Sequence, residues 1–93
     1  MIISFADKGT ELVATGYRVA RYAFIESTLR RKLALLEIAG QLSDLRVPPG
    51  NHLEKLKGDW AGFHSIRVND QWRLCFKWTS QGPAEVQLVD YHR

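Results

Sequence analysis

The chain has 93 residues and a formal net charge of +3 at pH 7, with a pI near 9.3. This length predicts one domain over residues 1–93, near the lower end of the usual size range. Apolar residues at 45% and charged residues at 25% are ordinary globular values that exclude a disordered tail. No apolar run approaches the ~20 residues of a bilayer span, so we expect no membrane association. The basic balance permits nucleic-acid binding without proving it.

The first residues and the cysteine content bear on the cellular setting. The opening MIISFADKGT lacks the basic segment and apolar stretch of a secretory signal. Cys75, the one cysteine, excludes an internal disulfide and a multi-cysteine zinc site. The three histidines show no metal-ligand spacing such as HExxH. We therefore expect a cytoplasmic protein with no metal or cofactor.

The first half of the chain is predicted to be mainly helical. Residues 2–5 (IISF) predict a short strand, after which Asp7 is suited to cap a helix and Gly16 to end it. From residue 21 to residue 42, apolar side chains recur at helical spacing. They include Ile25, Leu29, Leu33 and Leu36. The run Pro48-Pro49-Gly50 then predicts a loop.

The second half of the chain has the character of β-structure. Residues 63–69 (FHSIRVN) and 72–78 (WRLCFKW) alternate between apolar and polar side chains, and 84–91 (AEVQLVDY) is rich in β-forming residues. Helices grouped before strands favour an α+β domain, with the N-terminal helices packed on one face of an antiparallel sheet.

The hairpin between the first two of these strands has two possible registers. A three-residue loop at 69–71 pairs Ile66 with Leu74, whereas a two-residue loop would place Ile66 opposite Arg73. Register is strongly specified where one face of a sheet is buried, and the three-residue loop gives a continuous apolar face. That face carries Ile66, Val68, Trp72, Leu74 and Phe76. The sequence therefore predicts the three-residue loop, in which Asn and Asp tolerate the left-handed conformation.

The same register places two arginines together on the other face of the sheet. Arg67 is predicted to lie directly opposite Arg73, although like charges in that position are destabilising. One explanation is a solvated face on which the two side chains splay apart. The other is a bound anion, because the guanidinium fork matches phosphate geometry. Lys55 and Lys57 lie just upstream, so in the second case a phosphodiester would lie across the sheet.

Other residues capable of chemistry have simpler structural explanations. His64 stands in an apolar alternation, and Cys75 in mid-strand has no base beside it in the sequence, so both are expected to be packing residues. Trp72 belongs to the predicted core face. Trp60, in the loop GDWAGF, is the better candidate for stacking on a base.

A family pattern is carried by LKGD, SIRVNDQWRLCF and the terminal DYH. At these spacings they resemble the HigB-like branch of the RelE/ParE toxin superfamily, the toxins of bacterial type II toxin–antitoxin modules. The opening residues and LSDLRVPPGN also fit, so the likeness covers the whole chain. It implies a single RelE-like toxin domain in which helices lie against a twisted antiparallel sheet.

The resemblance also implies a function and partners. These toxins are endoribonucleases that cleave messenger RNA in the A site of the 30S ribosomal subunit and so inhibit translation. The partner is a HigA-like helix-turn-helix antitoxin, and operator DNA is bound only through that antitoxin. Two alternatives stay open: a non-catalytic antitoxin-binding co-repressor module, and a ParE-like gyrase inhibitor. A complete set of basic residues with DYH favours the nuclease, because a purely binding protein would not need it.

The resemblance assigns roles to individual residues. Metal-independent RNA cleavage uses the 2′-hydroxyl as an internal nucleophile, and it needs proton transfer and stabilisation of the phosphorane. His92 is the natural proton donor or acceptor near neutral pH. The implied catalytic set is His92, Asp90, Tyr91, Arg73 and Glu54. The implied RNA- or phosphate-binding set is Lys57, Arg67, Lys55, His52 and Lys77.

Position 54 departs from the pattern of some relatives, which carry a histidine four residues before the glycine of KGD. Here that position is Glu54. In an extended segment, His52 projects in the same direction as Glu54 and is a possible substitute. Otherwise Glu54 itself is the base. The division of the acid and base roles stays open.

Overall fold

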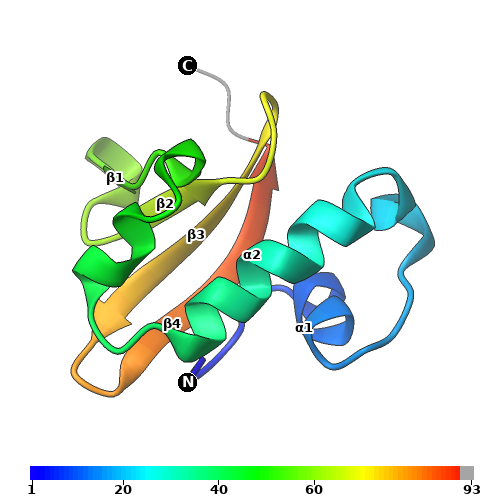
Figure 1. The fold of residues 1–93 in the computed structure, drawn as a ribbon, viewed down its shortest axis with the longest axis horizontal. Coiled ribbons are helices and arrows are strands. Elements are labelled where there is room, and N and C mark those ends of the chain that lie inside the picture. The colour runs from blue at the N-terminus through cyan, green and yellow to red at the C-terminus, as the bar shows by residue number, and fades with distance from the viewer. Residues whose placement is uncertain (91–93) are drawn as a thin grey trace.

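Residues 1–90 are described by the computed structural model of the protein. Helix α1 spans Lys8–Ala14 and helix α2 spans Glu26–Ile38. An antiparallel sheet follows, with its four strands in chain order across the sheet. These are β1 (Glu54–Lys55), β2 (His64–Arg67), β3 (Trp72–Thr79) and β4 (Gly82–Asp90). Figure 1 shows α2 lying across one face of this twisted sheet, which confirms the predicted α+β fold. No helix in residues 1–90 is long and apolar enough to cross a bilayer.

The N-terminal segment lies along β4 without forming a regular strand. Phe5 and Val86 form one isolated parallel bridge, which is all that remains of the strand predicted over residues 2–5. The approach to β4 is close: a Cβ atom on Gly82 would lie 2.2 Å from the carbonyl oxygen of Met1. Gly82 also has a φ of 134°, which side-chain-bearing residues rarely adopt. A glycine is therefore required where the N-terminus meets the sheet.

The helix predicted over residues 21–42 is divided into three pieces. The 3₁₀ helix η1 spans Ala20–Ile25, α2 follows directly, and a second 3₁₀ helix, η2, spans Leu42–Arg46. The carboxylate of Asp44 accepts hydrogen bonds from the backbone N–H groups of residues 40 and 41, at 2.9 and 3.2 Å. This cap starts a new helical turn, so the apolar periodicity continues although the helix itself has ended.

Helix α1 begins at the predicted cap, Asp7. One carboxylate oxygen of Asp7 accepts from the N–H of Gly9 at 3.2 Å, and the other accepts from the hydroxyls of Thr10 and Tyr22. The Thr10 hydroxyl oxygen in turn accepts from the N–H of Leu88 in β4, at 3.2 Å. Asp7 therefore both caps α1 and holds it against the sheet.

Replacement of Asp7 by alanine is expected to lower the free energy of unfolding by about 1–2 kcal/mol, because a side-chain cap is lost. Asp7→Asn keeps an accepting oxygen and is expected to lose less. Urea unfolding followed by circular dichroism measures both. The control is Glu11→Ala on the same helix, where an exposed ion pair with Lys8 at 3.4 Å contributes little. Equal losses for Asp7→Ala and Glu11→Ala would contradict the capping role.

The hairpin between β2 and β3 has the predicted three-residue loop. Ile66 pairs with Leu74. The side-chain oxygen of Asn69 accepts from the N–H groups of Gln71 and Trp72, both at 2.8 Å. The turn is therefore closed by an asparagine side chain and not by a glycine, which explains how the loop forms without one.

The hydrophobic core lies between α2 and the sheet face that the register predicted. Ile66, Leu74 and Phe76 are fully buried there, and Trp72 is partly buried against them. The helices contribute Val13, Ile25, Leu29, Leu33 and Leu36. The opposite face of the sheet carries Ser65, Arg73 and Cys75, which are also buried.

Candidate active site

The sheet face opposite α2 gathers the arginines with two other polar side chains. Arg67 pairs with Arg73, as predicted, and Ser65 pairs with Cys75 two positions along β2. Glu54 of β1 pairs with Ser65. Because paired residues share a face and side chains alternate along a strand, these residues lie on one side of the sheet. We call Glu54, Ser65, Arg67 and Arg73 the arginine cluster.

Arg73 is held in place by hydrogen bonds from its side chain to Ser65 and His52. Its side chain is buried, with the residue 9% exposed. Nε donates to the Ser65 hydroxyl at 2.7 Å, and Nη2 donates to the backbone carbonyls of His52 and Ser65. These contacts come from two different segments, so they hold the planar guanidinium in one orientation. A positive charge that is already oriented can stabilise developing negative charge without reorganisation.

Arg67 turns away from Arg73 and toward the hairpin loop. Its Nη2 atom donates to the carboxylate of Asp70, which is almost completely exposed. The like-charge pair is therefore accommodated within the chain: one guanidinium is drawn outward to a carboxylate, and the other is held inward by Ser65. The two side chains splay apart, as the first explanation predicted, but Arg73 is buried and only Arg67 reaches the solvated surface. An anion is not required to hold the two arginines together.

The segment before β1 is not extended at His52. This residue ends the 3₁₀ helix η3 (Pro49–Asn51) in the left-handed conformation, with a φ of 43°. The expectation that His52 and Glu54 project the same way from an extended segment is therefore wrong. The backbone carbonyl of His52 contacts the arginine cluster by accepting a hydrogen bond from Arg73. Glu54, which is half-buried, faces Ser65 on the cluster side.

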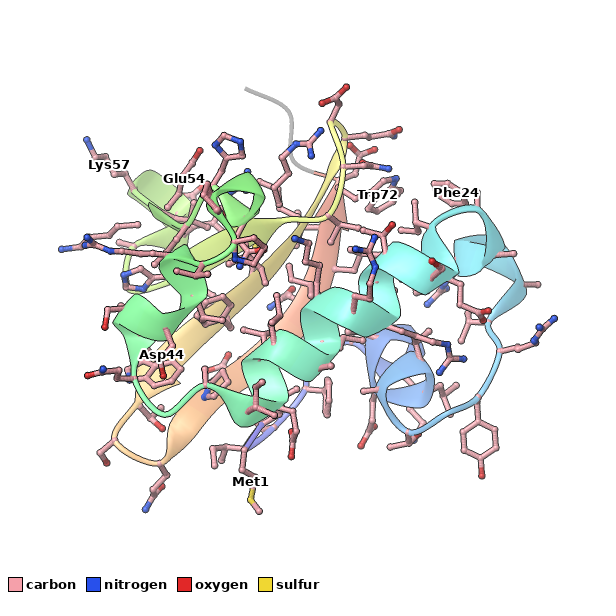
Figure 2. The ribbon with its side chains drawn as sticks, viewed as in Figure 1. Met1, Phe24, Asp44, Glu54, Lys57 and Trp72 are labelled. Atoms are coloured by element: carbon pink, nitrogen blue, oxygen red, sulfur yellow. The ribbon has the colours of Figure 1, made fainter. Side chains whose placement is uncertain are left out.

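The lysines of the predicted phosphate-binding set lie in three different surroundings. Lys57 is exposed just before the 3₁₀ helix η4 (Gly58–Trp60), and Figure 2 shows it at the same edge of the molecule as Glu54. Lys55 pairs with His64 and so lies on the face opposite the arginine cluster. Lys77 has its ammonium 3.2 Å from a carboxylate oxygen of Glu85. The structure therefore does not bring all these lysines together with the arginines.

Asp90 ends β4 beside the start of β3. It pairs with Trp72, and its carboxylate accepts from the side-chain amide of Gln71 at 3.0 Å. The adjoining pair is Arg73 with Val89. By strand alternation, Asp90 leaves the sheet on the face opposite Arg73, although both lie at the same end of the sheet.

The other two residues of the terminal DYH, Tyr91 and His92, lie outside the described residues. Their roles therefore stay predictions. Within residues 1–90, no three histidine, cysteine, aspartate or glutamate side chains gather in a way that could hold a metal ion.

The residues predicted to be structural are found in packed positions. Cys75 is fully buried, and burial raises the pKa of its thiol to about 11, so it stays protonated and inert at neutral pH. His64 stacks on Phe76, with ring centroids 6.3 Å apart. Burial of the imidazole lowers the pKa of His64, and the positive charge of Lys55 lowers it further. Trp60 is the last residue of η4, is partly exposed and packs edge-on against Phe63, and its role in stacking on a base stays a prediction.

Sequence reasoning missed the residues that hold Arg73 in place. Ser65 was given no role, and the carbonyl of His52 was not considered. The signal for Ser65 was present: it lies diagonally across the strand pair from Arg73, within reach of a long side chain. A backbone carbonyl brought close by a left-handed residue leaves no comparable pattern in a sequence.

Comparison with known proteins identifies the family. Residues 5–92 match the family model described as the RelE-like toxin of the type II toxin–antitoxin system HigB. The chain is 42% identical over 95 aligned positions to Toxin HigB-1 of Vibrio cholerae serotype O1, covering 100% of this chain and 99% of that one. It is also 46% identical over 50 positions to an uncharacterized protein of Haemophilus influenzae, covering 54% of this chain and 50% of that protein.

These matches agree with the resemblance carried by LKGD, SIRVNDQWRLCF and DYH, and with the fold. The family model spans both helices, the sheet and the arginine cluster. The relative from Vibrio cholerae aligns over the full length of this chain, so the likeness is not confined to one motif. The protein belongs to the HigB-like family of RelE-like toxins of type II toxin–antitoxin systems.

Proposed function

We propose that this toxin is a ribosome-dependent endoribonuclease that cleaves messenger RNA through the RNA's own 2′-hydroxyl and thereby inhibits translation. The observation that carries the proposal is the arrangement of Arg73. A guanidinium 9% exposed, fixed by Ser65 and by the carbonyl of His52, is more ordered than a solvated surface charge needs to be. Membership of a family of RelE-like toxins supports the same activity and implies an antitoxin partner.

The residues of the cluster suit the steps of this reaction. Attack by the 2′-hydroxyl needs a base, a stabiliser for the negatively charged phosphorane, and an acid for the leaving 5′-oxygen. Arg73 supplies the fixed positive charge. Glu54, on the cluster face, and His92 share the base and acid roles, and Tyr91 assists. Because the Asp90 side chain leaves the sheet on the face opposite Arg73, its proposed role is to orient the end of the chain and not to contact the phosphate. General acid–base catalysis typically raises the reaction rate about 10²–10⁴-fold, and an oriented charge adds a comparable factor.

The remaining basic side chains can contact only a few phosphates of the RNA. Arg67 stands at the rim of the cluster and Lys57 is exposed near Glu54, whereas Lys55 faces the other side. Each neutralised phosphate releases counterions, so few contacts give weak and salt-sensitive binding. We therefore propose that the ribosome presents the message in its A site, and that free RNA is a poor substrate.

The test compares messages on translating ribosomes with the same messages free in solution. We expect rapid cleavage inside coding regions only on the ribosome. Attack by the 2′-hydroxyl leaves a 5′-hydroxyl on the downstream fragment and a 2′,3′-cyclic or 3′-phosphate on the upstream fragment. A 5′-phosphate on the downstream fragment would show that water is the nucleophile.

The same toxin, induced in bacteria, separates this function from other modes of toxicity. A nuclease stops pulse-labelled protein synthesis before DNA synthesis, whereas a gyrase inhibitor reverses that order. Growth that continues with intact messages would indicate a protein that only binds its antitoxin. Operator DNA is expected to bind only when the antitoxin is present.

A further inference from the structure

A hollow of about 610 Å³ lies on the side of the sheet opposite the arginine cluster. It opens between η2 and the edge of the sheet formed by β1 and β2, where the chain reaches β1 from the helical layer. Its volume is within the range of about 300–1,000 Å³ that is typical of ligand sites. The lining residues are Leu42, Ser43, Arg46, Leu53, Lys55 and His64.

The rim of this hollow carries two cations with no acidic partner. Arg46 and Lys55 form no ion pair within the described part of the chain, whereas Arg21, Arg30 and Arg67 each contact a carboxylate. The nearby carboxylate of Asp44, labelled in Figure 2, is occupied by the backbone N–H groups of residues 40 and 41. The lining of the hollow therefore carries two positive charges and no carboxylate.

The inner part of the hollow is apolar, except for one buried nitrogen atom that lacks a hydrogen-bond partner. Leu42 and Leu53 are partly buried and pack on the edge of the core. The Nδ1 atom of His64 is buried and has no hydrogen-bond partner. An unsatisfied buried nitrogen is unfavourable, and a ligand with a complementary amide or carbonyl would supply the missing hydrogen bond. A neutral imidazole can donate from one ring nitrogen and accept at the other.

We propose that this hollow binds an acidic peptide segment of the antitoxin that carries an aliphatic anchor residue. Carboxylates of the segment pair with Arg46 and Lys55, and the aliphatic side chain lies on Leu42 and Leu53. A backbone amide or carbonyl of the segment completes the hydrogen bonding of His64. The inference rests on membership of the toxin family, which implies an antitoxin, and not on the proposed nuclease activity.

A peptide fits this surface better than RNA does. RNA binding is dominated by cations that follow the phosphate backbone, and only two line this hollow. The apolar floor and the buried imidazole suit an aliphatic side chain and a peptide group.

The first experiment measures the affinity of the full-length toxin for the antitoxin encoded beside it, by isothermal titration calorimetry. The test variant is the double substitution Arg46→Glu and Lys55→Glu. The matched control is Arg18→Glu with Arg31→Glu, an equal change of charge on exposed residues away from the hollow. We expect the test variant to bind about 100-fold more weakly and the control to bind within about 3-fold of the parent.

A second variant tests the proposal independently, in case the charge-reversal protein does not fold. Ser43 is exposed at the rim, and Ser43→Trp fills the hollow without changing charge. We expect it to weaken antitoxin binding by about 10-fold or more, with an unchanged circular dichroism spectrum. Parent-like antitoxin affinity in either folded test variant overturns the proposal.

Binding to 30S subunits is measured with the same proteins. If Arg46→Glu with Lys55→Glu loses the ribosome but keeps the antitoxin, the hollow is an RNA surface and the proposal is wrong. Neither binding measurement uses cleavage. Failure of the proposal therefore leaves the proposed nuclease function standing, and failure of the nuclease function leaves this proposal standing.

Discussion

Replacement of Arg73 by alanine is expected to slow cleavage of ribosome-bound messages by about 10²–10³-fold, the usual cost of removing one oriented stabiliser of transition-state charge. Ser65 and the carbonyl of His52 hold this guanidinium before substrate arrives. Single-turnover cleavage on programmed ribosomes measures the loss. A fall in the cleavage rate at saturating toxin, not only in affinity, is the expected signature of a transition-state contact.

Two further substitutions separate charge from geometry. Arg73→Lys keeps the charge but loses the planar fork that contacts two segments at once, so we expect only partial recovery of the rate. Arg31→Ala removes an exposed arginine from α2 and should leave cleavage unchanged. Parent-like cleavage by Arg73→Ala would show that this residue is structural.

Stability must be measured alongside activity for the Arg73 variants. In Arg73→Ala, the buried oxygens of Ser65 lose their donor, at a cost of about 1–3 kcal/mol. The midpoint of thermal unfolding is therefore measured for each variant, and the cleavage assay is run well below the lowest midpoint. A slow rate in a fully folded Arg73→Ala protein can then be attributed to the missing guanidinium.

The hairpin shows what a sequence determines well. The register followed from apolar alternation on two adjacent strands, because a slip of one residue would have buried Arg73 among the core side chains. Ile66 and Leu74 are paired and fully buried as a result. The pattern of the helical half was weaker evidence. Apolar spacing continued through residues 21–42, while caps such as Asp44 decided where each helical piece began.

The site shows where such reasoning stops. Placing Arg67 opposite Arg73 needed only strand pairing, but the separate paths of the two guanidiniums depend on Asp70 and Ser65. The face occupied by Lys55 depends on β1, a two-residue strand that has no detectable alternation. Short elements and backbone carbonyls act through tertiary contacts, so they leave no periodic signal in the sequence.

Replacement of His92 by alanine is expected to lower the rate of message cleavage by about 10²–10⁴-fold, the usual contribution of a general acid or base. In the family pattern this residue closes DYH, which begins with Asp90, the last residue of β4. Arg93→Ala is the matched control, because it changes the neighbouring residue without removing an imidazole. We expect that control to retain activity close to that of the parent.

The pH dependence of cleavage distinguishes proton transfer from a positioning role for His92. Imidazole changes charge between about pH 5 and pH 8, so a rate limited by His92 should change across that range in the parent. In His92→Ala the remaining slow rate should lose this dependence, while His92→Gln, which can still form hydrogen bonds, should not restore the rate. Recovery of most of the rate by glutamine would assign His92 to positioning, and Glu54, on the cluster face beside Ser65, would then be the principal base.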